Sequence, residues 1–258
     1  MKIKGILIAS IFLSVAFVSC KEDVKEEFTP AGSSKVEFTI TDGSKEIKLN
    51  EQSEISTGYG FTLSMFKAYV SNVTLYKEDS TEVLLQDVAL LNFGDDNANS
   101  LSVTIPNGNY TSLRIGYGLT PEQNDADPFS FDESHPLSNT QSMQWPMIKY
   151  RFVKLEGYAV SQSTSDGYLV SIHPGTDPLY QVVNYTLNDL NVQDGYNNTL
   201  HISININDLF DGPSGVIDFA TDNANQVHMT ADDSHIGKIF MENMAAAAKL
   251  EVHQTAVQ

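Results

Sequence analysis

Imidazole groups are the side chains of this sequence best suited to bind a transition metal. All six histidines lie in the second half of the chain: His135, His173, His201, His228, His235 and His253. Neutral imidazole is a common ligand of copper, zinc and nickel. For each ring taken alone, a surface position or a structural hydrogen bond is the alternative interpretation. The chain has a single cysteine, so a zinc site built on several thiolates is excluded.

Two short segments are rich in the oxygen ligands that calcium prefers. They are Asp95-Asp96-Asn97-Ala98-Asn99 and Asn124-Asp125-Ala126-Asp127. Neither segment has the spacing of a calcium-binding loop, and Asp and Asn side chains also stabilise turns by bonding to nearby backbone. We therefore predict Asx-type turns at both places.

No catalytic motif is present. The sequence has no nucleophile elbow, phosphate-binding loop, His-Glu-x-x-His pair or dinucleotide fingerprint. Carboxylates are abundant, but abundance in an acidic chain does not indicate a catalytic pair. We predict that the protein is not an enzyme, with a hydrolase that uses two facing carboxylates as the enzymatic alternative.

The first twenty residues have the pattern of an export signal. Lys2 and Lys4 precede an apolar run over 6–18, and Ser19-Cys20 follows it. The run is shorter than the roughly 20 residues that span a bilayer. Cys20 is the only cysteine, so an internal disulfide cannot explain it. Its place at the end of the signal resembles the lipidated cysteine of a bacterial lipobox. We expect a signal peptide over 1–19, a lipid on Cys20, and an outer-membrane lipoprotein of the cell envelope, with ordinary secretion as the alternative.

The segment that follows Cys20 is polar and rich in Pro, Gly and Ser, so we predict a charged tether over 20–35. Its Lys21-Glu22-Asp23 start resembles a surface-export signal of some bacterial lipoproteins. The whole chain has a formal charge of −18, and no Lys or Arg occurs between Leu155 and Gly237. This charge argues against nucleic acid as a partner. The same negative charge disfavours docking of the folded domain on anionic lipid, so membrane contact is expected through the lipid on Cys20 alone.

Beyond the tether, apolar residues alternate with polar ones, as in half-buried strands. The pattern is clear over 36–40, 61–65, 101–105, 168–172 and 183–187, and clearest at Leu200, Ile202, Ile204 and Ile206. Turn-forming residues such as Asp42-Gly43 and Pro106-Asn107-Gly108-Asn109 separate these runs. We predict an all-β domain over 36–258, mainly an antiparallel sandwich or barrel-like fold.

One segment near the C-terminus has helical spacing instead. Ile236, Ile239, Phe240 and Met244 share one face, and Asp233-Ser234 could cap a helix that runs from His235 into the alanines at 245–248. The fold is therefore predicted to include a short C-terminal helix.

Four segments, in order along the chain, resemble the MbnP-like family of exported copper-binding proteins. The strongest is 137–157, with Met143-Gln144-Trp145 followed by Lys154-Leu155-Glu156-Gly157. The others are 66–75, with a Tyr-x-Ser-Asn pattern, 172–177, with a His-x-Gly turn at His173, and 239–244. This resemblance covers about residues 36–250 and implies a β-rich domain that binds one copper ion. It also implies a diheme peroxidase-like partner that oxidises a tryptophan ligand to kynurenine.

The resemblance places His173 at the family turn and Trp145 at the family tryptophan. No histidine precedes His135, so a copper site would have to use later imidazoles. The candidate ligands are His173 with His201 or His228, together with Trp145, and Met143 or Met147 as thioether donors. The alternatives are a core role for Trp145 and a metal-free surface binding module on the same sandwich.

Overall fold

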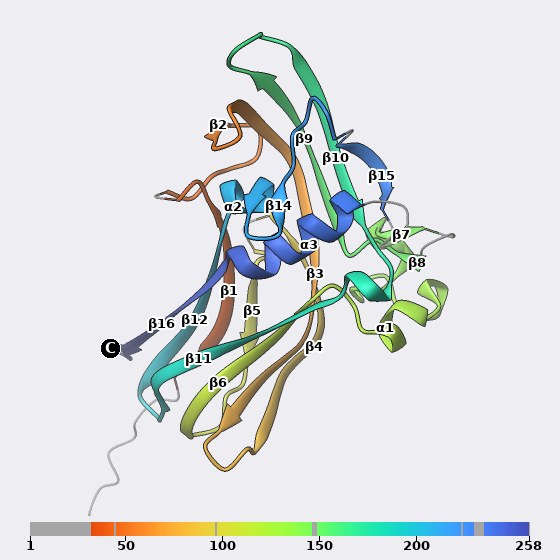
Figure 1. Cartoon of the computed structure of the whole chain (residues 1–258). Coiled ribbons are helices and arrows are strands. Elements are labelled where there is room, and N and C mark those ends of the chain that lie inside the picture. The colour runs from red at the N-terminus through yellow and green to blue at the C-terminus, as the bar shows by residue number, and fades with distance from the viewer. Residues whose placement is uncertain are drawn as a thin grey trace, which may run out of the picture.

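The computed structural model describes residues 32–43, 45–95, 97–145, 149–222, 224–229 and 235–257. Within them, β-strands predominate and form two main sheets (Figure 1). The predicted mainly β fold class is therefore confirmed. The predicted signal peptide, Cys20 and most of the tether lie outside the described residues. Among the helices of the described part, none is long and apolar enough to cross a bilayer.

The first sheet has four strands in the order β16-β12-β1-β5. β1 and β12 run parallel, and the other two pairs are antiparallel. Val36 and Phe38 of β1 and Leu200 and Ile202 of β12 are buried in one continuous core, which explains the alternation in the sequence. The strands are β1 (Ser34–Thr41), β5 (Ser100–Val103), β12 (Tyr196–Asn205) and β16 (Ala248–Ala256).

The second sheet has eight strands. Six follow the order β11-β6-β3-β9-β10-β15, and β2 and β4 also pair with β3. The only parallel pair described in this sheet is β10 with β15. The strands are β2 (Gln52–Ile55), β3 (Tyr59–Lys77), β4 (Glu82–Asn92), β6 (Gly108–Tyr117), β9 (Val153–Ser161), β10 (Gly167–Pro174), β11 (Gln181–Val192) and β15 (Asn225–Met229).

Strand β3 organises the second sheet because it pairs with four strands along its length. Its first half pairs with β2 and β9, and its second half pairs with β4 and β6. The register shifts between Ser71 and Thr74, where Asn72 has a positive φ of 47°. Asn tolerates this left-handed conformation better than most residues. The irregularity is therefore a β-bulge in the middle of a long strand.

Helix α3 (His235–Ala247) packs on strands of both sheets and closes one end of the core (Figure 1). Ile236, Phe240 and Met244 are buried, which confirms the predicted helix and its apolar face. The proposed cap at 233–234 lies outside the described residues. The other helices are α1 (Pro121–Asp125), α2 (Ile206–Phe210) and the 3-10 helices η1 (Pro128–Ser130), η2 (Asn139–Gln141) and η3 (Asp177–Leu179).

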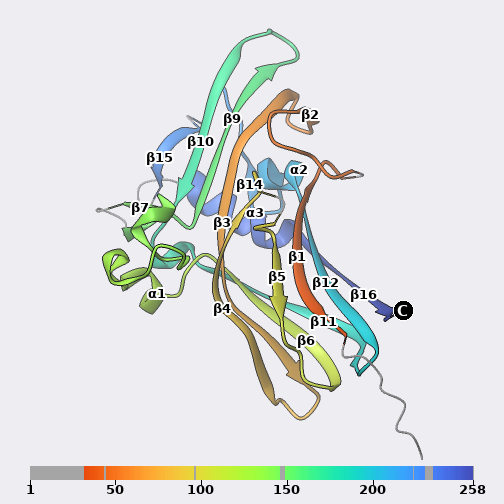
Figure 2. The same cartoon turned by 180° about the vertical axis from the view of Figure 1, so that it is seen from behind.

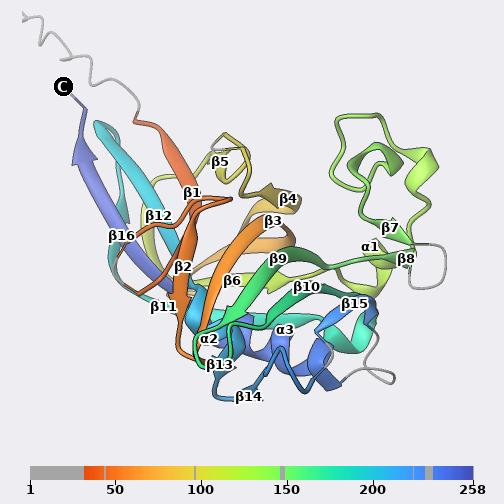
Figure 3. The same cartoon turned by 90° about the horizontal axis from the view of Figure 1, so that it is seen from above.

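Two short hairpins complete the fold. They are formed by β7 (Gln144–Trp145) with β8 (Lys149–Tyr150), and by β13 (Asp211–Gly212) with β14 (Gly215–Val216). The segment that carries α1, β7 and β8 lies on the opposite side of the molecule from β12 and β16 (Figures 2 and 3). Residues on these two sides therefore cannot share one metal ion.

Candidate metal centre

Strands β12 and β16 bring together three metal-ligating side chains on the outer face of the four-stranded sheet. His201 lies between the buried Leu200 and Ile202, so its side chain points away from the core. Glu251 is its direct partner on β16, and His253 follows two residues later. Because side chains alternate along a strand, Glu251 and His253 lie on the same face.

The ligand atoms of His201, Glu251 and His253 all lie within 4.8 Å of one another. Nε2 of His253 is 3.6 Å from Oε2 of Glu251, and the two imidazole rings have centroids 6.2 Å apart. His201 is half-buried, whereas Glu251 and His253 are exposed. Two imidazoles and one carboxylate suit Zn²⁺, Cu²⁺ or Ni²⁺ better than a soft monovalent ion.

Strand β1 supports this group from the other side of β12. Oγ1 of Thr39 lies 2.9 Å from Nε2 of His201. Glu37 is the direct partner of His201 on β1, and its carboxylate pairs with Nζ of Lys35 at 2.9 Å. This hydrogen bond orients the His201 ring, and in the tautomer in which Nε2–H donates to Oγ1 of Thr39, Nδ1 has the free lone pair that a metal ion needs.

His173 lies in a different environment from His201. It is buried on β10, in the eight-stranded sheet, and its Nε2 is 3.0 Å from Oε1 of Glu156 on β9. The backbone of His228 lies next to that of His173, because Gln226 pairs with Ile172 and Met229 with Pro174 across a register shift. The side chain of His228 is not among those described. A metal site that combines His173 with His228 therefore stays a prediction.

Trp145 lies on β7, with the guanidinium of Arg151 over its ring at 5.1 Å from the centroid. Met143 is fully buried nearby in the chain, and Met147 lies outside the described residues. Because β7 and β12 lie on opposite sides of the molecule, Trp145 and His201 do not meet (Figure 3). The predicted ligands therefore do not form one site. His201 lies on β12 of the four-stranded sheet, whereas His173 lies on β10 of the eight-stranded sheet and Trp145 on the β7–β8 hairpin.

Glu251 and His253 were not predicted as ligands. The signal for them is the alternation Leu250, Val252 against Glu251, His253 in the last strand, which follows directly after the alanine-rich end of α3. Two such ligands at positions i and i+2 of a strand indicate a metal site only when the neighbouring strand, which supplies the third ligand, is known. The parallel pairing of β1 with β12, and the return of the chain through α3 to pair β16 with β12, supply that neighbour.

The first acidic segment forms turns, as predicted, whereas Asn124 and Asp125 of the second segment belong to α1 and only its end leads into a turn-like 3-10 helix. Oδ1 of Asp95 accepts a hydrogen bond from the backbone of Asn97, and Oδ1 of Asp127 accepts one from Phe129 at the start of η1. Asp125 forms an ion pair with Lys149. In the described part of these segments the carboxylates therefore serve local structure.

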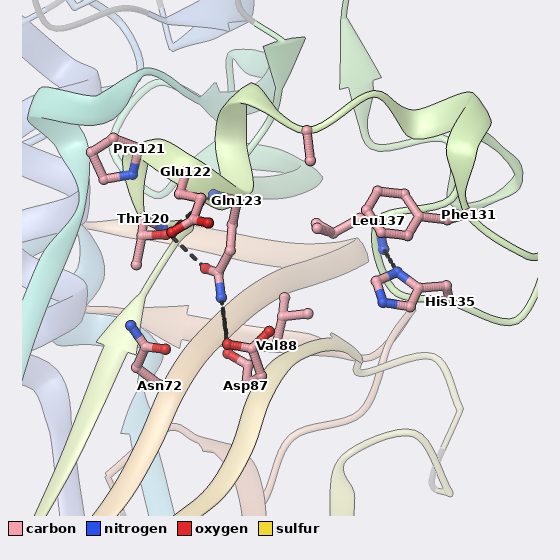
Figure 4. A pocket seen from close by; sticks show the side chains of 11 residues that line it. Asn72, Asp87, Val88, Thr120, Pro121, Glu122, Gln123, Phe131, His135 and Leu137 are labelled. Carbon is pink, nitrogen blue, oxygen red and sulfur yellow. Dashed lines mark hydrogen bonds between the residues drawn. The ribbon is translucent and has the colours of Figure 1, made fainter.

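A cavity of about 580 Å³ lies between α1 and the bulge of β3 (Figure 4). Asp87 and Gln123 are hydrogen-bonded on one side, with Nε2 to Oδ1 at 3.1 Å. On the other side Phe131 and His135 are stacked with centroids 4.2 Å apart. His135 also accepts the N–H of Leu137 through Nδ1. This ring therefore has a structural role, and the cavity has one polar and one aromatic wall.

The fold and the site define a mainly β protein of two main sheets with an imidazole–carboxylate group on one outer face. The MbnP family model matches residues 31–230, so the chain belongs to the MbnP family. His201 lies within the matched residues, and Glu251 and His253 lie beyond them. The resemblance recognised from the four sequence segments is thereby confirmed.

One similar solved structure is MbnP from Methylosinus trichosporium. It has 16% sequence identity over 66% of this chain and 76% of that chain, with a TM-score of 0.45. No curated protein sequence matches this chain.

Proposed function

We propose that this protein is an exported, lipid-anchored member of the MbnP family that binds a divalent transition metal, copper above all, through His201, Glu251 and His253. The observation that supports this proposal is the convergence of the three ligand atoms within 4.8 Å of one another. Among divalent ions a site of nitrogen and oxygen ligands binds Cu²⁺ most tightly. A bound ion would supply Lewis acidity or redox activity, while the protein holds it on the sheet surface.

Electrostatics favour this site over one built from Trp145 and His173. The guanidinium of Arg151 already lies over the Trp145 ring, and the carboxylate of Glu156 is engaged with His173. A metal cation there would also face the positive charge of Arg151. At the His201 group the neighbouring charges are the carboxylates of Glu251 and Glu37, the ammonium group of Lys35, which is paired to Glu37, and that of Lys249 on the same face of β16.

Metal titration of the mature protein tests the assignment, with Cys20→Ser to remove the thiol. We expect one Cu²⁺ per chain, and a loss of affinity of about tenfold or more in His201→Ala and in His253→Ala. His235→Ala is the matched control, since His235 is exposed at the start of α3. Unchanged affinity in both variants, or loss in His173→Ala alone, would place the metal elsewhere.

The lipid anchor is a separate proposal, supported by the export signal and the single cysteine at its end. Intact-mass analysis of the protein from its membrane fraction should find diacylglycerol and acyl chains on Cys20. Cys20→Ala should move the protein from the detergent phase to the aqueous phase. An unmodified N-terminus on a secreted wild-type protein would contradict the anchor. Conversion of Trp145 to kynurenine, which the resemblance implies, requires a partner that oxidises the indole ring, so the mass of the peptide that contains Trp145 also tests for that partner.

A second candidate function rests on the cavity of Figure 4, whose lining includes the carboxylates of Asp87 and Glu122 and the stacked rings of Phe131 and His135. Such a lining suits a small organic cation. If copper, zinc and nickel all fail to bind, a metal-free binding module becomes the better interpretation. An increase in melting temperature with an organic amine, lost in Asp87→Asn, would support it.

A further inference from the structure

Two lysines lie directly opposite each other on neighbouring strands. Lys67 of β3 is the partner of Lys154 of β9. Phe66 and Ala68 on one strand, and Val153 and Leu155 on the other, are fully buried in the core. Both lysines therefore project from the outer face of the eight-stranded sheet. Like charges opposite each other in a sheet are destabilising unless a negative charge lies between them.

A third cation adjoins this pair. Arg151 bridges to Gly175 just before β9, and its Nη1 donates a hydrogen bond to the carbonyl of Gln144 at 3.0 Å. Its guanidinium is held against the Trp145 ring. Its Nε is buried and has no hydrogen-bond partner among the described residues. The guanidinium is thus fixed in place with part of its donor capacity unused.

The protein itself neutralises these three cations only in part. Within the described residues, no carboxylate lies within 4.0 Å of Lys67, Lys154 or Arg151, although such pairs are present elsewhere in the protein. Glu156 is the acidic group that acts on both Arg151 and Lys154. Its carboxylate already binds His173 at 3.0 Å.

Burial raises the cost of this charge. Desolvation lowers the pKa of Lys154, and Glu156 opposes that shift, whereas Arg151 and Lys67 add to it. Desolvation likewise lowers the pKa of Arg151. Partly buried charges interact more strongly than exposed ones because the surrounding dielectric is lower. In a chain with a net charge of −18, this is a local excess of positive charge.

We propose that Lys67, Lys154 and Arg151 form a binding site for a divalent oxyanion, namely a phosphate group. Three cations and one carboxylate leave an excess of two positive charges, which a phosphate dianion balances and a monocarboxylate does not. Arginine and lysine side chains are the usual phosphate ligands, through charge-assisted hydrogen bonds. This site is independent of the proposed metal centre, which lies on the other sheet.

Trp145 provides the readout, because it is the only tryptophan and its ring contacts Arg151. Titration with inorganic phosphate at low ionic strength should change its fluorescence saturably. Sulfate should compete, and acetate should bind much more weakly. The affinities of inorganic phosphate and glycerol phosphate distinguish two kinds of ligand. Tighter binding of inorganic phosphate indicates a site for the free ion, and tighter binding of glycerol phosphate indicates a site for a phosphorylated organic molecule.

Charge-matched variants complete the test. Lys154→Gln and Lys67→Gln should each weaken phosphate binding about tenfold, because each removes one charge-assisted hydrogen bond. Lys238→Gln removes the same charge from α3, where Lys238 pairs with Glu242 at 3.7 Å, and should leave binding unchanged. No saturable response to phosphate or sulfate, or an equal effect of Lys238→Gln, would overturn the proposal. A normal circular dichroism spectrum confirms that each variant is folded.

Discussion

The hydroxyl of Thr39 lies 2.9 Å from Nε2 of His201, so a side chain of β1 holds an imidazole of the neighbouring strand β12. Hydrogen bonds of this kind fix the ring orientation and the tautomer of metal-binding histidines, and their removal costs affinity. Glu251 and His253 are exposed and lie on β16, which is separated from β1 by β12 in the sheet. His201 is therefore the best-oriented ligand of the candidate centre.

Thr39→Val should weaken Cu²⁺ binding by about tenfold while the ligands themselves are kept. Valine has nearly the same shape as threonine but cannot form the hydrogen bond to His201. Competition with a chelator of known affinity measures the change. Ser203→Ala, on the same face of β12, is the control, since no hydrogen bond from its hydroxyl to His201 is described. Equal affinities in Thr39→Val and wild type would contradict a supporting role.

Glu156→Gln should lower the free energy of unfolding by about 1 kcal/mol, because it removes the carboxylate that binds His173 and acts on Arg151 and Lys154. Urea denaturation in the presence of a chelator measures this. Glu251→Gln is the same substitution at an exposed carboxylate, and without metal it should change the stability by less than about 0.5 kcal/mol. A neutral Glu156→Gln variant would argue against an unbalanced positive charge at this face.

Asn243 is a fully buried amide on α3 that holds two other segments to the helix. Its Oδ1 accepts the N–H of Ser214 at 3.0 Å, and its Nδ2 donates to the carbonyls of Leu209 and Gly215 at 3.2 and 2.9 Å. Asn243→Ala would remove the hydrogen-bond partner of these three backbone groups and leave a space where a fully buried amide was packed.

We therefore expect Asn243→Ala to lower the free energy of unfolding by about 3 kcal/mol, near the upper range for a single site. Chemical denaturation followed by circular dichroism measures the loss. Glu242→Ala, next to it on α3 and in an exposed ion pair with Lys238, should cost less than about 1 kcal/mol. Similar losses in the two variants would show that helix propensity, and not the buried amide, dominates.

Local patterns in the sequence predict the strands well because side-chain alternation reflects burial at each position. They do not predict which strands pair. The turn at Pro106-Asn107-Gly108-Asn109 suggests a simple return of the chain, but β5 before it pairs with β1 in one sheet and β6 after it pairs with β3 and β11 in the other. The turn therefore carries the chain from one sheet to the other.

The clearest alternation also ends one residue earlier than its pattern indicates. β12 stops at Asn205, whose Oδ1 accepts the N–H of Asn207 and so caps α2, which starts at Ile206. Ile206 is buried at the start of α2, and it would also be buried if β12 continued through it. Hydrophobicity alone therefore cannot distinguish a longer strand from the start of a helix. For the site, His201 could be recognised from the sequence as a candidate ligand. Glu251 and His253 could not, since their position depends on long-range pairing of β16 with β12.

Burial of tyrosines makes the stability of the fold sensitive to alkaline pH. Desolvation raises the pKa of Tyr150 and of Tyr185 to about 12 from an ordinary value of 10.0. Between these values the unfolded chain loses protons that the folded protein retains. The free energy of unfolding must then fall as the pH rises from 10 towards 12, by about 1.4 kcal/mol per pH unit for each such tyrosine. Below pH 10 these groups cause no change.

Tyr185→Phe should reduce the alkaline decrease in the free energy of unfolding by about 1.4 kcal/mol per pH unit, the contribution of one tyrosine. At neutral pH the same variant should cost about 1 kcal/mol, because its hydroxyl lies 2.6 Å from that of Tyr117 in a hydrogen bond. Tyr158→Phe is the control, since Tyr158 is 46% exposed, and it should leave the decrease unchanged. Urea denaturation at a series of pH values measures the slopes. Parallel slopes in wild type and Tyr185→Phe would mean that Tyr185 ionises in the folded protein as readily as in the unfolded chain.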